Sequence, residues 1–338
     1  MNMLRKLFIL VFTLSVYNST SYAQISLPPS RVEWNTLEEA LQKNVEKSRP
    51  LFVFVYSNNN DSSRIMLETT FANEGMAGYI SRNFYPIAFN VEEYRQKMQT
   101  TPPEQFMALA KEILDRNLTP PAVVYIDRAG TGTPVFGYKT MKQLEPYLVF
   151  FAEEINTTTP FEEFYKYYVK VYPPDDTTGV SMTRAIVKWR TLEEAFEEIE
   201  TSPKKIFIDI YADWRIGNTI MFMSTYNNPI IGNYLNEHFI PVRLDAVGND
   251  TIKVKGVEYV NLGEEQGHPF HQLPIAMLEG KMFLPAMLIL NEEGQVIQKM
   301  QSYFSPETIE SILKYYGEDF YKTQSWDDFL KTFQSSFQ

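Results

Sequence analysis

The side chains best suited to acid–base or metal chemistry are three histidines, all in the second half of the 338-residue chain: His238, His268 and His271. His268 and His271 are three residues apart, a spacing that would place both on one face of a helix. Glu264 and Glu265 lie just upstream. A metal site needs a third and a fourth ligand that converge with open geometry. The pair is therefore only a weak metal candidate, surface or packing roles are favoured, and no cofactor is expected.

Hydroxyl nucleophiles are present without the partners that would activate them. Ser62, Ser63 and Thr219 stand at the start of a predicted helix, where hydroxyl groups commonly cap backbone N–H groups. The first half has no histidine that could activate Ser63, and the second half has no G-x-S-x-G context. The chain also has neither a P-loop nor a Rossmann glycine fingerprint. The sequence thus carries no signal for a hydrolase or a nucleotide-binding enzyme.

Composition excludes further functions. The sequence contains no cysteine, so its own side chains cannot carry out thiol–disulfide exchange. Its net charge is −11, with a pI near 5.0. An acidic protein repels phosphate backbones and anionic lipid headgroups, so nucleic acid and peripheral membrane binding are disfavoured.

Residues 1–23 are predicted to be a signal peptide. Arg5 and Lys6 precede an apolar run over 7–16, and Ser21-Tyr22-Ala23 is a small-x-small cleavage site. No later stretch approaches the roughly 20 apolar residues of a transmembrane helix. We therefore expect a soluble periplasmic protein with no integral membrane segment after signal removal, although secretion further out stays open.

An internal duplication determines the predicted domain organisation. The segment 32–40, VEWNTLEEA, recurs at 187–195 as VKWRTLEEA, a shift of 187 − 32 = 155. The same shift relates 52–56 to 207–211. Further on the shift becomes 285 − 121 = 164, so the second copy carries a nine-residue insertion around 248–267. The predicted organisation is a first domain over 24–171, a linker over 172–183 and a second domain over 184–338.

Each copy is predicted to be α/β, with a central mixed sheet flanked by helices. A helix begins at Thr36 and at Thr191, and a glutamate three residues on completes a capping box. Continuous apolar runs predict strands buried on both faces, and helices between them imply crossover connections. The predicted strands are 51–56, 85–90 and a third directly after Pro121 in the first copy, and 206–211, 240–245 and a third directly after Pro285 in the second.

Residues 208–221, IDIYADWRIGNTIM, resemble the active-site strand and helix of thioredoxin-like proteins. The stretch from Gly267 to Pro285 resembles exported thioredoxin-like proteins of Bacteroidetes-type bacteria in particular. The resemblance covers nearly all of 184–338 and is weaker but co-linear in the first copy. It implies two thioredoxin-like folds in tandem.

The resemblance also implies which residues replace the reactive cysteine pair. Arg215 and Asn218 stand in the two cysteine positions of the second copy, and Asn60 and Ser63 in those of the first. None of these side chains can attack or resolve a disulfide. Asp209 stands where the family keeps a buried carboxylate, and it is predicted to be a remnant or a partner for a lysine or arginine.

The resemblance further implies a groove beside two prolines in the cis-proline position. These are Pro121 and Pro285, and the other groove candidates are Trp214, Met221 and Phe283. The sequence predicts a redox-inactive periplasmic module that binds a protein or peptide partner or acts as a scaffold, and not an enzyme. Two alternatives stay open: a general holdase chaperone, and a metal-dependent enzyme that would use His268 and His271.

Overall fold

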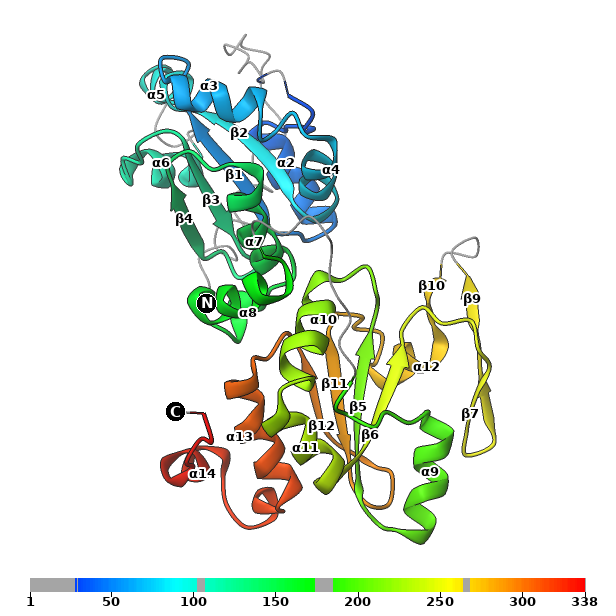
Figure 1. Cartoon of the computed structure of the whole chain (residues 1–338). Coiled ribbons are helices and arrows are strands. Elements are labelled where there is room, and N and C mark those ends of the chain that lie inside the picture. The colour runs from blue at the N-terminus through cyan, green and yellow to red at the C-terminus, as the bar shows by residue number, and fades with distance from the viewer. Residues whose placement is uncertain (1–27, 29, 102–106, 174–184, 264–267, 338) are drawn as a thin grey trace. The chain divides into compact units, whose positions relative to one another are not determined.

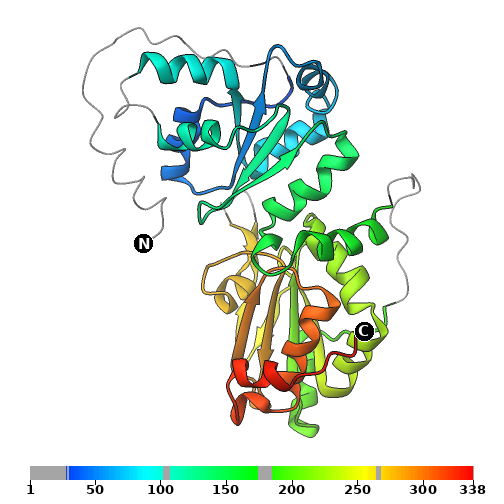
Figure 2. The same ribbon diagram turned by 90° about the vertical axis from the view of Figure 1, so that its left-hand side faces the viewer.

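The computed structural model describes residues 28, 30–101, 107–173, 185–263 and 268–337 (Figures 1 and 2). The predicted signal peptide, 1–23, lies outside the described residues, and so does most of the predicted linker over 172–183. Within the described part of the chain, no helix has the length and apolar character needed to cross a membrane.

The chain divides into two compact units between Ala152 and Glu153. The sequence prediction ended the first domain at residue 171. Helix α8 (Phe161–Val171) instead packs within the second unit, on α10 (Ile216–Ile220) and on the π-helix η2 (Met221–Tyr226). The difference arises because α8 buries its apolar face on elements that lie far downstream, which helical periodicity does not reveal.

The first unit contains a four-stranded mixed sheet in the order β2-β1-β3-β4. Strand β1 pairs in parallel with β2 and antiparallel with β3, and β3 pairs antiparallel with β4. The strands are β1 (Leu51–Tyr56), β2 (Tyr85–Asn90), β3 (Ala122–Ile126) and β4 (Gly132–Phe136). The predictions of strands at 51–56, at 85–90 and directly after Pro121 are confirmed.

The second unit repeats this sheet in the order β12-β11-β5-β6, with the same parallel and antiparallel pairings. Its strands are β5 (Lys205–Tyr211), β6 (Phe239–Asp245), β11 (Ala286–Leu290) and β12 (Val296–Gln301). The predicted fold class is confirmed, because each unit has a central mixed sheet flanked by helices. Figure 1 shows α11 and α13 on one side of the second sheet and α9 on the other.

Alternation along the central strands assigns helices to the two faces of each sheet. In the first unit, Val53 lies on the face that packs on α2, α5 and α6. Phe52 lies on the opposite face, which packs on aromatic residues next to α3 and α4 and within α7. The helices are α2 (Leu37–Glu46), α3 (Asp61–Glu68), α4 (Glu74–Asn83), α5 (Val91–Thr100), α6 (Ala108–Asp115) and α7 (Met141–Ala152).

In the second unit, the face with Ile208 packs on α9 and α12, and the face with Phe207 packs on η2 and on the start of β6. The remaining elements of this unit are α9 (Leu192–Thr201), α11 (Pro229–His238), α12 (Gln272–Met277), α13 (Pro306–Gly317) and α14 (Trp326–Thr332), with short 3-10 helices η1 (Ile155–Thr157) and η4 (Phe320–Lys322).

The duplicated capping boxes form as predicted. The Thr36 hydroxyl accepts a hydrogen bond from the Glu39 N–H at 3.2 Å, and the Glu39 carboxylate accepts one from the Thr36 N–H at 2.8 Å. Thr191 and Glu194 form the same pair of bonds with the same distances. A capping box satisfies two backbone donors that a helix start would otherwise leave free.

The insertion predicted around 248–267 folds into two short antiparallel pairs, β7 with β8 and β9 with β10. Partly buried apolar side chains, among them Ile252 and Phe270, anchor it on the core of the second unit. The strands are β7 (Ile252–Val254), β8 (Val257–Tyr259), β9 (Asn261–Gly263) and β10 (His268–His271), and residues 264–267 lie outside the described residues.

Asp209 is a buried, paired carboxylate on β5. Its oxygens accept hydrogen bonds from the Tyr226 hydroxyl at 3.0 Å and from the Arg243 guanidinium at 3.2 Å. Burial raises the pKa of Asp209, while Arg243 and Tyr226 act in the opposite direction. The guanidinium also lies 3.8 Å from the Tyr211 ring centroid. Asp209 therefore serves as the partner of an arginine, which was one of the two roles predicted for it.

The first copy fills the same three positions with apolar residues. With the shift of 155, Phe54, Phe71 and Ala88 correspond to Asp209, Tyr226 and Arg243, and Phe54 packs on Phe71 at 4.8 Å. Replacing a buried ion pair by apolar residues is often neutral or stabilising, whereas removing one partner leaves an unpaired buried charge.

We predict that Arg243→Ala lowers the free energy of unfolding by about 3 kcal/mol, because the Asp209 carboxylate loses its cation. The triple variant Asp209→Phe, Tyr226→Phe and Arg243→Ala, which installs the set of the first copy, should recover most of that loss. Urea denaturation of both variants tests this. A triple variant less stable than Arg243→Ala alone would contradict it.

Candidate functional site

The candidate site lies at one edge of each sheet, where the residues implied by the resemblance come together. In the second unit Ile210 of β5 pairs with Ala286 of β11, so the loop after β5 and the loop before β11 leave the sheet at the same edge. In the first unit Val55 pairs with Ala122 in the same way. The bonds Pro120–Pro121 and Leu284–Pro285 are cis. Each edge thus combines the start of a helix with a cis-proline loop.

The second-cysteine positions hold buried polar side chains with a shared internal role. The Ser63 hydroxyl accepts a hydrogen bond from the Ser57 N–H at 3.4 Å, and the Asn218 side-chain oxygen accepts one from the Ala212 N–H, also at 3.4 Å. Ser57 and Ala212 correspond under the shift of 155. In both copies the side chain that replaces the cysteine ties the helix start to the end of the strand.

The first-cysteine positions differ between the copies. Asn60 caps α3, because its side-chain oxygen accepts a hydrogen bond from the Ser63 N–H at 2.8 Å. Arg215 is the corresponding cap residue of α10 and makes no side-chain cap bond. A guanidinium only donates, so it cannot accept from the N–H groups that follow it. These groups need an acceptor from elsewhere.

That acceptor is Glu153, a residue that the sequence analysis did not single out. Its two carboxylate oxygens accept hydrogen bonds from the Ile216 N–H at 3.0 Å and the Gly217 N–H at 2.8 Å. Glycine at position 217 permits this geometry, because a Cβ there would force the Glu153 carboxylate to shift. The chain has 42 acidic residues, and no local pattern distinguishes this one.

Glu153 is buried, with 2% of the residue exposed. Burial raises its pKa to about 7 from an ordinary value of 4.5, against the opposing effects of Arg215 and the two backbone N–H groups. Removing an ionised carboxylate from water costs free energy, and its hydrogen bonds and the nearby positive charge offset that cost only in part. The helix start beside the first-cysteine position of the second copy therefore holds a carboxyl group of this chain.

Trp214 is the exposed aromatic side chain of this edge. It is 57% exposed, its ring lies 4.9 Å from the Arg215 guanidinium, and its centroid is 6.4 Å from that of Phe270 on β10. The residue that corresponds to Trp214 in the first copy is Asn59, which is exposed and polar. An exposed tryptophan beside a cation is typical of contact residues in protein interfaces.

Two other predicted groove residues are placed differently. Phe283 is half-buried in the loop before Pro285. Met221 is 1% exposed at the start of η2, so it packs in the interior and does not line an open groove. Met221 was predicted to border the groove because it lies near the helix start in the sequence, but its side chain is buried in the second unit.

The histidines lie on a strand and at helix ends. His271 is buried, its Nδ1 accepts a hydrogen bond from the Leu273 N–H at 3.1 Å, and its Nε2 lies 2.9 Å from the Asp250 carbonyl oxygen. His268 begins β10, and His238 ends α11 stacked on Tyr234. Among the described residues no group of three or more candidate metal ligands gathers. Both nitrogens of His271 already have main-chain partners, so the geometry gives the metal hypothesis no support.

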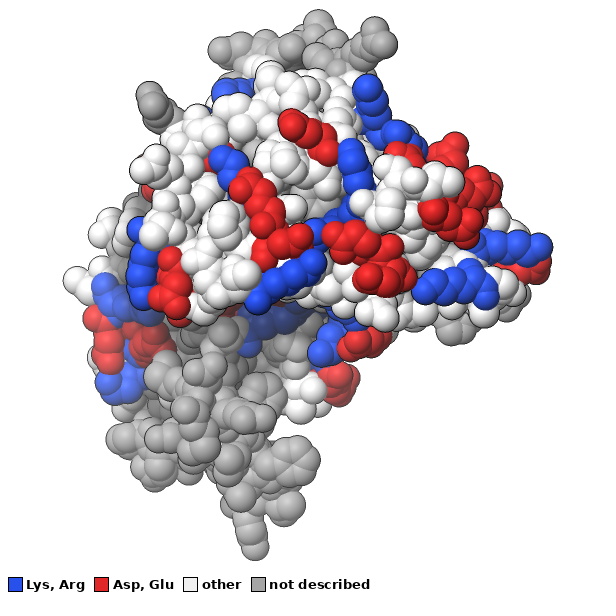
Figure 3. Space-filling model, turned by 90° about the horizontal axis from the view of Figure 1, so that it is seen from below, with Lys and Arg blue, Asp and Glu red and all other residues white. Residues whose placement is uncertain are grey.

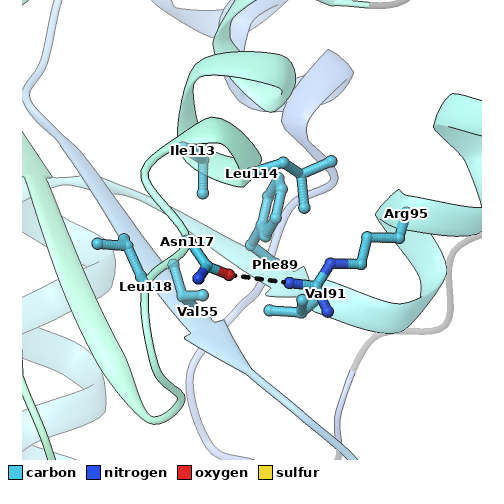
Figure 4. Close-up of a pocket in the computed structure, with 8 residues that line it drawn as sticks. All are labelled: Val55, Phe89, Val91, Arg95, Ile113, Leu114, Asn117 and Leu118. Carbon is cyan, nitrogen blue, oxygen red and sulfur yellow. Dashed lines mark hydrogen bonds between the residues drawn. The ribbon is translucent and has the colours of Figure 1, made fainter.

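A small hollow in the first unit is shown in Figure 4. Its volume of about 190 Å³, which includes open solvent, is below the 300 Å³ or more of typical ligand pockets. The Arg95 guanidinium donates to the Asn117 side chain at 3.3 Å across it. It is lined by Val55, Phe89, Val91, Arg95, Ile113, Leu114, Asn117 and Leu118. We therefore do not regard it as a ligand site.

Charged side chains give no single-sign surface on the face drawn in Figure 3, where basic and acidic groups are interspersed. Several exposed ion pairs of the described residues lie within one helix, such as Lys331 with Asp328. Exposed pairs of this kind contribute little to stability. This face therefore shows no continuous basic field of the kind that attracts nucleic acid.

Neither a scan against known protein families nor a search of curated proteins finds a match for the chain. Solved structures that resemble it include a thioredoxin-fold protein from Helicobacter pylori, with a TM-score of 0.30 and 13% identity over 38% of this chain and 79% of that one. A thioredoxin from Thermus thermophilus matches with a TM-score of 0.28 and 18% identity, over 35% and 85%. The C-terminal domain of DsbD from Neisseria meningitidis, in its oxidised form, matches with a TM-score of 0.26 and 16% identity, over 37% and 89%.

At these identities and scores the likenesses concern the fold alone and carry no conclusion about activity or partners. The sheet order, the pairings and the helix that follows the central strand define a thioredoxin-like fold in each unit. The chain has no cysteine. Fold and site together define a thioredoxin-fold protein that lacks the redox-active cysteine pair.

We predict that Glu153 makes stability depend on pH. Because its pKa is raised in the folded protein, its contribution is fully present below about pH 4.5 and is lost as the pH rises through about 7. The difference in unfolding free energy between wild type and Glu153→Gln should therefore fall by on the order of 3 kcal/mol across that interval. Denaturant titrations at several pH values measure it. A difference that grows with pH would show that the two N–H groups and Arg215 outweigh burial.

Proposed function

We propose that this chain is a redox-inactive thioredoxin-fold protein that binds a protein or peptide partner at the sheet edge of its second unit. The observation that carries the proposal is Trp214, 57% exposed on the loop after β5 and flanked by Arg215 and Phe270. Binding residues commonly sit on loops that a rigid scaffold positions. Tryptophan and arginine supply a large share of interface energy.

The replaced cysteine positions support binding over catalysis. Ser63 and Asn218 are buried and hydrogen-bonded to the main chain, and Asn60 caps its own helix. Side chains engaged in this way are not free to act as nucleophiles or general bases. What remains accessible at the edge is Trp214 between Asp213 and Arg215, an aromatic side chain with charged neighbours, which suits recognition of an extended segment.

The two copies are not equivalent in this proposal. The first copy has Asn59 where the second has Trp214, so the loop after the central strand offers an aromatic anchor in the second copy and a polar residue in the first. A general holdase would be expected to bind many unrelated segments with no dependence on one side chain. Dependence on Trp214 therefore separates the two functions.

The proposed location is the periplasm. This rests on the signal-peptide pattern over 1–23 and on the resemblance to exported thioredoxin-like proteins of Bacteroidetes-type bacteria. Two thioredoxin-like units in tandem without cysteine would remain folded there without disulfides, held by their two apolar cores.

We predict that Trp214→Ala weakens binding of segments selected from a phage library of 12-residue peptides by about tenfold or more, as expected for loss of an interface anchor. Ile230→Ala is the matched control, because Ile230 is 39% exposed on α11 of the same unit. Fluorescence anisotropy with the selected peptides gives the dissociation constants. Equal affinities for wild type and Trp214→Ala would contradict the site, and tight binding of most unselected peptides would favour the holdase.

A further inference from the structure

Residues 153–171, here called the arm, cover the helix layer of the second unit beside the former active site. At its start, the Glu153 carboxylate accepts from the Ile216 and Gly217 N–H groups. The Thr158 hydroxyl donates to the Tyr303 carbonyl oxygen at 2.8 Å. The arm thus begins in contact with the replaced cysteine position and continues onto the loop before α13.

Helix α8 of the arm adds an aromatic contact and several polar ones. The Phe164 ring meets the Tyr303 ring edge to face, with 5.7 Å between centroids, and both side chains are buried. The Tyr167 hydroxyl donates to the Glu307 carboxylate at 2.7 Å, and Lys166 lies 2.8 Å from the same carboxylate.

The first residues of α13 complete this set of contacts. The Glu163 carboxylate accepts from the Ser305 hydroxyl and from the Thr308 hydroxyl, the latter at 3.3 Å. Ser305 is also the N-cap of α13. Side chains, and not sheet pairing, therefore hold the arm on this face.

The second copy has an equivalent of the arm that docks elsewhere. Residues 318–332 correspond to it with a shift of 318 − 153 = 165, since η4 and α14 follow Asp319 as η1 and α8 follow Glu154. Asp319 and Glu154 both have positive φ, 63° and 52°. Yet α14 packs on α13 of its own unit, with Phe329 5.2 Å from Tyr315, whereas α8 packs on η2 and α10. The same element can therefore use different surfaces.

We propose that the face formed by α10, η2 and the start of α13 is a peptide-binding surface that the chain occupies itself with its arm, and that a partner segment must displace the arm to reach it. This rests on the proposed function and specifies its chemistry. The surface accepts a carboxylate at two backbone N–H groups, an aromatic ring against Tyr303 and a hydroxyl at the Tyr303 carbonyl oxygen. A segment of another protein with these groups would compete with the arm.

Part of the arm is held by polar contacts that water can replace, and part by buried side chains such as Phe164 and Tyr168, which a partner segment must replace with its own. Several of its polar contacts lie at partly exposed side chains, as the 53% exposure of Lys166 illustrates. The carboxyl group of Glu153 also gives up its hydration when the arm docks. Arm docking is therefore a balance between aromatic burial and the cost of removing polar groups from water.

The test uses the full chain and a fluorescently labelled synthetic peptide of residues 151–172. The arm is weakened by the double substitution Glu153→Gln with Phe164→Ala, and all measurements are made at about pH 5, below the pH range in which the contribution of Glu153 is lost. The matched control is Glu162→Gln with Tyr165→Ala, which also changes one glutamate and one aromatic residue of the arm, but at exposed positions of α8. A second peptide that carries Glu153→Gln tests the carboxylate.

We expect the labelled peptide to bind the arm-weakened chain at least tenfold more tightly than wild type or the control, and the Glu153→Gln peptide to bind it at least tenfold more weakly. Adding Gly217→Ala to the arm-weakened chain should abolish the difference in affinity between the two peptides. A Cβ at position 217 would occupy the place of the Glu153 carboxylate oxygen. Equal binding to all three chains, or no binding to the arm-weakened chain, overturns the proposal.

A second measurement applies if the double variant does not fold. In the single variant Glu153→Gln, hydrogen exchange at the Ile216 and Gly217 amides should accelerate at least tenfold, and excess wild-type peptide should restore protection. Unchanged exchange, or no effect of the peptide, overturns the proposal. If peptides selected through Trp214 still bind while the arm peptide does not, the arm proposal fails and the proposed function stands. The reverse result removes the Trp214 site alone.

Discussion

The start of the helix that follows the central strand imposes the constraint on which the rest of this protein depends. Its first backbone N–H groups have no partner within the helix and need an acceptor. Here Asn60 supplies its own amide oxygen in the first unit, and Glu153 supplies a carboxylate in the second. The two copies therefore satisfy the same helix start in different ways, one with a local cap and the other with a residue distant in the sequence.

The first copy has become self-contained at this edge. Its cap is local, its neighbour Asn59 is polar, and the interior behind it is aromatic around Phe54 and Phe71. The second copy carries a charged interior, with Asp209 paired to Arg243, and an exposed Trp214. The backbone of the two copies is alike, while the loop after the central strand exposes a tryptophan in the second copy and an asparagine in the first.

Loss of cysteine and retention of the scaffold are physically compatible because the fold does not depend on the thiols. The second-cysteine positions keep a buried group that bonds to the strand end, through Ser63 in one copy and Asn218 in the other. These bonds preserve the approach of helix and strand without any redox chemistry. The cis-proline loops at Pro121 and Pro285 persist at the same edges. A stable edge of this kind is a suitable place for recognition.

The sequence alone determined the duplication, the capping boxes at Thr36 and Thr191, the buried strands and the absence of thiol chemistry, because these follow from residue types and local spacing. It did not reveal that α8 belongs with the second unit, that Met221 faces inward or that Glu153 caps α10. Each of these depends on residues far apart in the chain meeting in space. Glu153 and Gly217 are 64 positions apart, and only the packing of the arm on the second unit makes one carboxylate out of many the partner of that helix.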